Sequence, residues 1–178
     1  MAFEERTIDS EIVYEGPVFK IRKHKVECVN GVTSYRDILE HSGGSVMLGV
    51  KDDGKILMVK QYRKALERVV LELPAGKIDP GEEPLDAAGR ELREETGYTP
   101  SEVKHMVTYT PTCGYSAEKL HIYLCTDLTE GDTDFDETED LDTYEFTADE
   151  LIEMILNGEI EDGKTIIGIL FARQAGLI

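Results

Sequence analysis

Carboxylates are concentrated in one short stretch of this sequence, residues 90–95, which reads RELREE. Glu94 and Glu95 follow Glu91 by three and four residues, so on a helix all three side chains would lie close together. Like charges at these spacings repel, and each pair costs an isolated helix roughly 0.2–0.5 kcal/mol. Arg90 can reach Glu94 across one turn and relieve part of that cost. Such a cluster is either a solvated face or a set of oxygen ligands for a hard divalent ion such as Mg²⁺.

The segment just before these carboxylates favours a metal site over a solvated face. Pro74, Gly76, Pro80 and Gly81 predict a tight loop that returns the chain against the helix. A rigid loop can offer a backbone carbonyl, and a divalent ion takes a few carboxylates together with such a carbonyl. Carboxylates on adjacent helical turns can also bridge two ions.

The carboxylates need a helix to position them, and the sequence predicts one over residues 84–96, ended by Gly97. Leu85, Ala88 and Leu92 share one face of this helix, which can pack on a sheet. The three carboxylates fall on an adjacent face. We therefore expect one face of the helix in the core and the neighbouring face at the candidate site.

Alternating apolar and polar residues predict strands on both sides of this helix. Asn30-Gly31 predicts one hairpin turn, and residues 52–54 predict a second between strands 44–51 and 55–63. Strands and helices in this order predict an α+β domain with a mixed sheet. The other expected elements are strands 11–16, 19–29, 33–41, 69–73, 102–111 and 119–128, an acidic loop over 129–142, a helix 147–158 opened by a capping box from Thr147 to Glu150, and a helix 163–175.

The net charge of the whole chain argues against some classes of binding partner. It has 37 acidic and 19 basic residues, a net charge of −18, so we expect no nucleic acid partner. A small phosphate-bearing ligand can still bind where divalent cations screen the repulsion. The three cysteines are widely spaced and form no CxxC, which indicates reduced thiols. With no apolar run of about 18 residues and no apolar signal segment, we expect no membrane partner and a cytoplasmic location.

Residues 76–98 resemble the Nudix box, G-x5-E-x7-R-E-U-x-E-E-x-G-U, in which U is an apolar residue. Tyr98 at the final apolar position is a mild departure. The resemblance implies a Nudix-type α/β/α sandwich with a mixed sheet, here preceded by N-terminal antiparallel strands. It also implies metal-dependent hydrolysis of a nucleoside diphosphate linked to another moiety. The matching residues are Gly76, Glu82, Arg90, Glu91, Leu92, Glu94, Glu95, Gly97 and Tyr98.

The Nudix resemblance also implies roles for individual residues. Mg²⁺, or in its place Mn²⁺, would neutralise a pyrophosphate and activate water for in-line attack on phosphorus. Arg90 would orient the glutamates through ion pairs and so belong to the catalytic set with Glu95. Glu82 would be a carboxylate that accompanies the metal site. The implied metal ligands in this part of the chain are Glu91, Glu94, Glu95 and the carbonyl of Ala75.

Stretches outside the box resemble the ADP-ribose pyrophosphatase branch of the family. They are residues 59–63, 71–79, 108–125 and 158–172. The resemblance implies cleavage of ADP-ribose, or a related nucleotide sugar, to AMP and ribose 5-phosphate. Other Nudix substrates, such as a GDP-sugar or a dinucleotide, remain open. So does a non-catalytic nucleotide-binding module.

The same branch implies substrate contacts, and each has a plainer alternative. Arg63 would bind a phosphate through its guanidinium, or it could cap a strand end or pair with Glu67. Glu72 would bind a ribose or adenine, or it could be a charge at a strand edge. Arg36 would reach the nucleotide, or it could be a plain exposed strand residue. Two further residues would contact the terminal ribose or form only a turn: Gly114 and Tyr115.

The catalytic base is expected in the acidic loop over residues 129–142. The resemblance places Glu139 as base or further metal ligand, with Glu137 as second choice. Asp140 stands where the branch has an apolar residue, so the register here is open. Loop closure would be needed to bring Glu139 to the metal-bound water, and the alternative is a solvated lid.

The N-terminal strands are not part of the minimal Nudix core. In relatives of this branch such strands pair with a second subunit and help to form the substrate site. We therefore expect a homodimer, with residues 1–40 as the dimerising strands and 41–178 as the hydrolase domain.

Overall fold

The computed structural model describes residues 3–135 and 140–178. The chain divides into two compact units. The N-terminal unit comprises Met1–Gly43 and Thr110–Lys119, and the helix-bearing unit comprises Gly44–Tyr109 and Leu120–Ile178. The sequence-based division at residue 40 stays a prediction. Among the described residues, no helix combines the length and apolar character that crossing a membrane requires.

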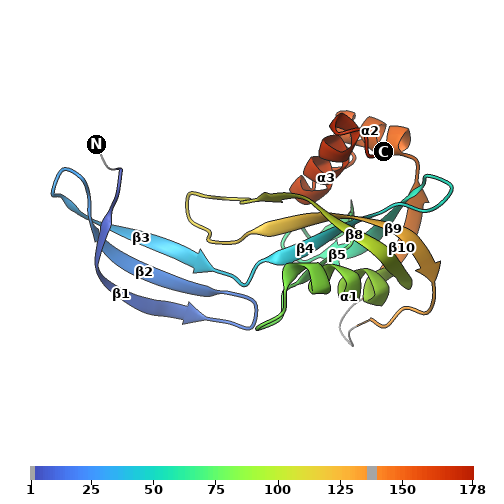
Figure 1. Ribbon diagram of the computed structural model, residues 1–178. Helices are drawn as coiled ribbons and strands as arrows, with labels where there is room; N and C mark the ends of the chain where they lie inside the picture. Colours follow the sequence, from blue (N-terminus) through green and yellow to red (C-terminus); the bar gives the residue numbers. More distant parts are fainter. Residues whose placement is uncertain (1–2, 136–139) are drawn as a thin grey trace. The chain divides into compact units, whose positions relative to one another are not determined.

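The N-terminal unit is a three-stranded antiparallel sheet in the order β1-β2-β3 (Figure 1). Gly31 has φ +79° in the turn between β2 and β3, which confirms the predicted hairpin. Leu39 joins this sheet to the segment 110–119, because its N–H donates to Tyr115 O at 2.8 Å and its carbonyl accepts from Ala117 N at 2.9 Å. The strands are β1 Arg6–Glu15, β2 Lys20–Glu27 and β3 Thr33–Glu40.

The helix-bearing unit is built on a four-stranded sheet in the order β7-β4-β9-β8. The central pair β4 and β9 is parallel, and the other two pairs are antiparallel, so the predicted mixed sheet is confirmed. Every residue of β4 is buried, as expected for a strand covered on both faces. The strands are β4 Gly44–Gly49, β7 Ala75–Lys77, β8 Tyr98–Tyr109 and β9 Leu120–Glu130.

A second sheet of this unit has the order β10-β5-β6. The predicted hairpin of 44–51 with 55–63 is wrong beyond its turn. Lys51 N donates to Lys55 O at 2.9 Å, but the only bridge described between the two segments is Val50 with Ile56. The strands separate because β4 is already paired with β7 and β9 and has no free edge. The second sheet comprises β5 Ile56–Arg63, β6 Arg68–Glu72 and β10 Leu141–Phe146.

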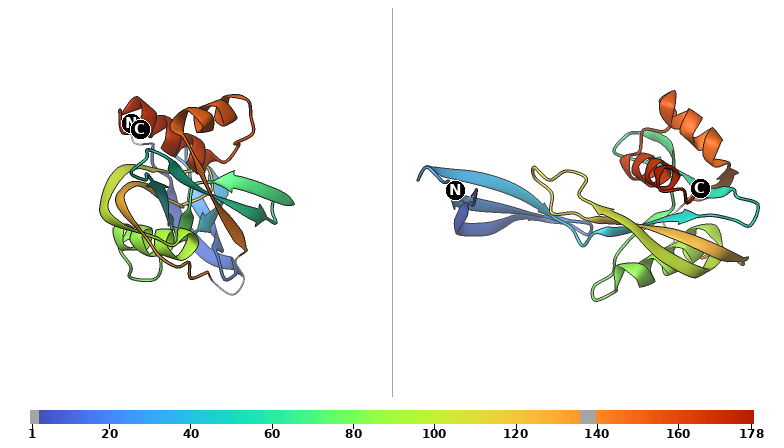
Figure 2. Two further views of the ribbon diagram at one scale, coloured as in Figure 1. Left: turned by 90° about the vertical axis from the view of Figure 1, so that its right-hand side faces the viewer. Right: turned by 45° about the horizontal axis from the view of Figure 1, so that its top comes forward.

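Helices cover both faces of the four-stranded sheet (Figures 1 and 2). Helix α1 packs Ala88 and Leu92 against one apolar cluster of the sheets, whereas α2 and α3 pack on a second cluster. This layering is the expected α/β/α sandwich. The helices are α1 Pro84–Thr96, α2 Ala148–Leu156 and α3 Gly163–Gln174.

The three predicted helices are present, and their end signals are as expected. Gly97 ends α1 with φ +78°, and both hydrogen bonds of the Thr147–Glu150 capping box are formed. One detail of α1 was predicted wrongly. Leu85 is 47% exposed, whereas Ala87 and Glu95 are buried. The core face of α1 therefore includes a carboxylate that we had expected on the neighbouring face.

Candidate active site

Arg90 lies at the centre of the carboxylate cluster on α1. Its Nε and Nη2 donate to the two oxygens of Glu82 at 2.8 and 2.9 Å. Its Nη1 donates to Glu91 at 2.8 Å and to Glu94 at 3.0 Å. The hydrogen bonds from Arg90 are the main cause that lowers the pKa of Glu82 to about 2. One guanidinium thus holds three carboxylates in fixed places, as its predicted orienting role requires.

The loop that precedes α1 lies directly against two of these carboxylates. Ala75 N donates to Glu95 Oε2 at 3.0 Å, and the Glu95 side chain is 3% exposed. A Cβ at Gly76 would lie 1.7 Å from Cδ of Glu91, so only glycine leaves room for that carboxylate. Met47 N donates to Pro74 O at 2.9 Å and ties the loop to β4. The loop and the helix therefore share one built site.

Arg63 and Glu72 form an ion pair at the ends of β5 and β6. Arg63 Nε donates to Glu72 Oε1 at 2.7 Å, so Arg63 does not pair with Glu67, which contacts Lys64 instead. Glu72 is only 2% exposed, and Lys164 of α3 donates to its other oxygen. Its predicted contact with ribose or adenine stays a prediction, but both of its oxygens are bound within this chain. The alternative, an ordinary charge at a strand edge, would leave the carboxylate exposed, and Glu72 is buried.

Comparison with known proteins identifies the family of this chain. The model of the NUDIX domain matches residues 43–167. The chain belongs to the Nudix family. The matched residues include α1, the loop that precedes it and both sheets of the helix-bearing unit. The protein is therefore a Nudix hydrolase.

Individual relatives of this Nudix protein have several names. It is 39% identical to the methanol dehydrogenase activator of Bacillus methanolicus, with 95% of this chain and 92% of that protein covered. It is 38% identical to the ADP-ribose pyrophosphatase of Bacillus subtilis (strain 168), with 96% and 93% covered. A solved structure described as an ADP compounds hydrolase superposes with a TM-score of 0.84 over 96% of this chain and 93% of that chain. At 21% identity, that structure supports the fold alone.

The donors at the Nudix box fit a hard divalent ion. Glu91, Glu95 and the carbonyl of Ala75 offer oxygen atoms only, which is the ligand type that Mg²⁺ prefers. In the ranges 3–135 and 140–178, no three His, Cys, Asp or Glu side chains converge closely enough to hold a metal ion. Arg90 engages Glu91 and Glu94 together in this arrangement. The complete ligand set therefore stays a prediction.

The acidic loop is held to α1 by its described flanks. Gly131 N donates to Gly97 O at 2.8 Å, and Asp134 N donates to Glu94 O at 3.0 Å. On the other side, Thr143 Oγ1 donates to Glu95 O at 3.4 Å. Backbone carbonyls at the end of α1 thus accept hydrogen bonds from both flanks of the loop. The predicted bases, Glu137 and Glu139, lie outside the described residues.

The remaining predicted contacts belong to the N-terminal unit. Arg36 on β3 pairs with Glu5, and it also donates to Ser34 Oγ at 2.9 Å and to Tyr35 O at 2.8 Å. Gly114 lies in the turn before Tyr115, and the Tyr115 side chain is exposed. These three residues belong to the N-terminal unit, whereas the glutamates of α1 belong to the helix-bearing unit. Their contacts with substrate stay predictions.

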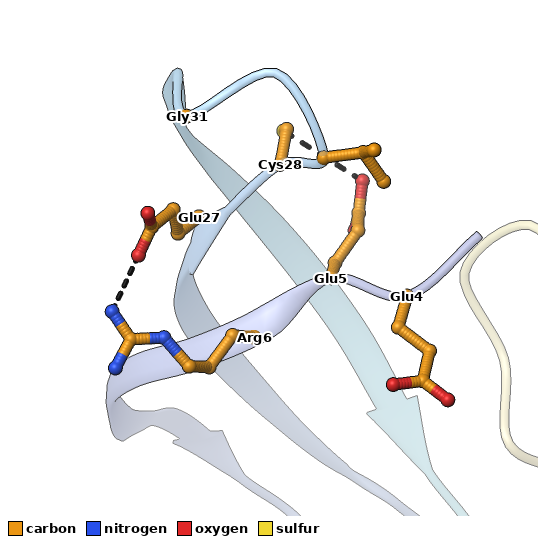
Figure 3. A pocket seen from close by; sticks show the side chains of 7 residues that line it. Glu4, Glu5, Arg6, Glu27, Cys28 and Gly31 are labelled. Atoms are coloured by element: carbon orange, nitrogen blue, oxygen red, sulfur yellow. Dashed lines mark hydrogen bonds and ion pairs between the residues drawn. The ribbon is translucent and has the colours of Figure 1, made fainter. Parts of the chain in front are cut away.

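A pocket of about 600 Å³ lies at one end of the N-terminal sheet. Figure 3 shows the side chains that line it. Arg6 pairs with Glu27 on one side of it, and Cys28 Sγ lies 3.8 Å from Glu5 on the other. None of the predicted catalytic or substrate-binding residues lines this pocket. Its lining consists of Glu4, Glu5, Arg6, Glu27, Cys28, Val29 and Gly31.

Sequence reasoning missed the residues that support Glu72 from α3. Lys164 is 10% exposed, and its Nζ also donates to Asp162 Oδ2 at 3.1 Å. Thr165 Oγ1 accepts from Leu73 N at 2.8 Å. One signal was available: a carboxylate in a buried strand requires a cationic partner, and the "DGKT" at the start of the last helix offers one.

Proposed function

We propose that this Nudix hydrolase cleaves the pyrophosphate of ADP-ribose, or of a closely related nucleotide sugar, and releases AMP and ribose 5-phosphate from ADP-ribose. The observation that carries the proposal is the intact carboxylate network of Arg90, Glu82, Glu91 and Glu94. This network occurs in a chain that is 38% identical, over 172 residues, to a protein named ADP-ribose pyrophosphatase. A chain without chemistry would have no need for three like charges around one arginine.

In the proposed mechanism, Mg²⁺ or Mn²⁺ would be held by Glu91 and Glu95, with Glu94 and the Ala75 carbonyl, and with Glu139 from the acidic loop. When bound, the ion neutralises phosphate charge and lowers the pKa of a bound water. Arg90 holds its glutamates in place, and the N–H of Ala75 fixes Glu95. These contacts preorganise the site before substrate arrives.

The other groups of the proposed mechanism act on the substrate and the proton. The Arg63 guanidinium would bind a substrate phosphate, because its planar group can donate two parallel N–H bonds to phosphate oxygens. Glu139, or failing it Glu137, would accept the proton of the attacking water. Arg36, Gly114 and Tyr115 would contact the nucleotide or the terminal ribose.

The proposal extends to the assembly and location of the protein. A homodimer is supported by β1, whose ten residues are all exposed although they include Ile8, Ile12 and Val13. A cytoplasmic location is supported by the three cysteines, which are all free.

The proposed substrate is tested by a panel of ADP-ribose, a GDP-sugar and a dinucleotide with Mg²⁺. We expect ADP-ribose to give AMP and ribose 5-phosphate with the highest kcat/KM of the panel. Cleavage of the GDP-sugar with no cleavage of ADP-ribose would overturn the substrate assignment. Related proteins include one named GDP-mannose pyrophosphatase at 28% identity, so this rival is a real alternative.

A second candidate function is activation of a dehydrogenase. It is favoured by the relative named methanol dehydrogenase activator, which is 39% identical over 171 residues. Measuring the activity of a methanol dehydrogenase with and without this protein, in the presence of Mg²⁺, would test it. If stimulation occurs and is lost in Glu95→Gln, the activation depends on the same hydrolytic site.

A further inference from the structure

The buried carboxylate of Glu72 is held by two cations from distant parts of the chain. Glu72 ends β6 and is 2% exposed. Arg63 reaches it from the end of β5, and Lys164 reaches it from the first turn of α3, 92 residues along the chain. A carboxylate this deeply buried has to be paired, but a single cation would satisfy that requirement. The second cation calls for an explanation.

The two cations divide the oxygens of Glu72 between them. Arg63 Nε donates to Oε1 at 2.7 Å, and Lys164 Nζ donates to Oε2. An arginine beside a carboxylate commonly donates to both oxygens at once. Lys164 donates to Oε2 and Arg63 binds through Nε alone, and Glu72 is the one hydrogen-bond partner of the Arg63 guanidinium within residues 3–135 and 140–178. The Arg63 side chain is 41% exposed, so Nη1 and Nη2 remain available to a ligand.

Lys164 is itself fixed by the first turn of α3. Asp162 Oδ2 accepts from Lys164 Nζ at 3.1 Å and from Thr165 Oγ1 at 2.6 Å. Thr165 Oγ1 in turn accepts from Leu73 N at 2.8 Å, directly after Glu72. Lys164 is 10% exposed, and Thr165 is fully buried. The start of α3 is therefore fastened to the strand that carries Glu72, and the lysine has little freedom to leave it.

Arg63 lies within electrostatic reach of α1, the helix proposed to hold the metal. Burial opposes its charge, but the hydrogen bond and charge of Glu72, with the charges of Glu95 and Asp162, outweigh burial and raise the pKa of Arg63. The guanidinium thus stays charged near Glu95. An arginine with two available donors beside a metal site suits one oxyanion of a pyrophosphate.

We propose that Lys164 is a positioning residue, which occupies one oxygen of Glu72 and so keeps the outer nitrogens of Arg63 available for a substrate phosphate. This inference rests on the proposed function, which assigns the phosphate contact to Arg63. Without Lys164, Arg63 would turn to bind both oxygens of Glu72. Arg63 and Glu72 would then neutralise each other. The site would lose the free N–H donors of Arg63 and one positive charge.

The experiment compares Lys164→Met and Lys164→Arg with the wild-type enzyme. Lys164→Met is expected to raise KM about tenfold or more, as the loss of one charge-assisted hydrogen bond implies, and to change kcat less than about threefold. Lys164→Arg can again donate to Glu72 and should restore KM to within about threefold. Lys55→Met is the matched control, because it removes one lysine charge from a 45% exposed position in the same unit.

A double-mutant cycle shows whether Lys164 acts through Arg63. In the background of Arg63→Gln, Lys164→Met should have little further effect on KM, because the residue it positions is gone. A fall in melting temperature without a change in KM is what a merely structural role would give. An unchanged KM in Lys164→Met, or a full additional effect in the Arg63→Gln background, would overturn the proposal.

The proposal can fail separately from the assignment of substrate. If the wild type does not cleave ADP-ribose, the proposed function fails, and the same KM comparison applies to whichever pyrophosphate compound of the panel is cleaved. A crystal structure of Lys164→Met needs no substrate at all. There Arg63 is expected to contact both oxygens of Glu72, and an Arg63 still bound through Nε alone would sink the inference.

Discussion

At the scale of single residues, Arg90 allows the carboxylates of α1 to stand close together. It donates to Glu82, Glu91 and Glu94 from one guanidinium. Glu94 has a second partner in Arg93 at 3.0 Å. Repulsion between neighbouring carboxylates would otherwise oppose the helix. A divalent ion at the proposed site would meet glutamates whose freedom Arg90 already restricts, which would lower the entropic cost of binding.

Glu95→Gln tests the proposed metal role of the most buried carboxylate of α1. The amide keeps the shape but removes the charge, so binding of Mg²⁺ and stabilisation of the transition state should both weaken. We expect turnover at saturating Mg²⁺ to fall at least about tenfold, which is roughly 1.4 kcal/mol of barrier. Glu102→Gln on an exposed position of β8 is the control and should keep full turnover. A smaller fall in Glu95→Gln, with the fold intact, would show that the metal role is wrong.

Glu82 predicts how stability changes with pH. Its pKa is lowered in the fold from 4.5 to about 2, chiefly by hydrogen bonds from Arg90. A lowered pKa contributes stability that is fully present above the unfolded value and is lost as the pH falls towards the folded value. The advantage of the wild type over Glu82→Gln should therefore be constant from about pH 7 to 5 and shrink between about pH 4.5 and 2. Urea unfolding of both proteins across this range measures it, and a difference that grows in acid would contradict the assignment.

At the scale of elements, the short strand β7 matters more than its length suggests. Its three residues bring the backbone of Ala75 and Gly76 to Glu95 and Glu91. Register with β4 sets this approach, because Val46 pairs with Ala75 and Ser45 with Gly76. The position of the buried strand β4 therefore fixes the loop at the proposed metal site.

Gly76→Ala tests this close approach. The added methyl would lie 1.7 Å from Cδ of Glu91, so the carboxylate or the strand has to move. We expect kcat/KM to fall at least about tenfold and the affinity for Mg²⁺ to weaken with it. Gly89→Ala is a matched control inside α1, where a Cβ meets nothing within 4 Å. It should raise stability by about 0.5–1 kcal/mol and leave activity unchanged. Full activity in Gly76→Ala would mean that Glu91 is not needed where it lies.

The sequence predicted those elements whose signals are local. Helix α1 has its stop signal in Gly97, and α2 has its capping box, so both were found within about two residues. β7 and β10 were missed, since a three-residue strand shows no alternation and β10 follows directly on a run of acids. The box residues were identified by their resemblance to the Nudix motif, and the family is confirmed. The contact of Lys164 with Glu72 was not, because it joins residues 92 positions apart through tertiary packing.

At the scale of the whole molecule, the charge of −18 works against an anionic substrate. The field of the protein slows the approach of a pyrophosphate unless cations accompany it. Arg63, Arg90 and Lys164 all lie in the helix-bearing unit, but each is paired with carboxylates. In the proposed function, divalent ions would therefore supply most of the neutralisation that binding of a pyrophosphate requires. The proposed metal would then be a condition of substrate binding as well as of chemistry.

The exposed strand β1 predicts the state of assembly. Ile8, Ile12 and Val13 are 47%, 43% and 53% exposed, and β1 forms an edge of its sheet. Such an edge with apolar side chains is normally covered by another chain. We expect light scattering to give about twice the chain mass of 20.0 kDa at micromolar concentration.

Ile12→Asp should weaken that dimer, because it places a charge on the surface that the partner would cover. Ser10→Asp adds the same charge to a position of β1 that is already polar, and it should disturb association less. The helix-bearing unit contains neither position, so its melting transition should stay in place in both variants. A wild-type chain that is monomeric at tens of micromolar would contradict the dimer. In that case the apolar residues of β1 would need another partner.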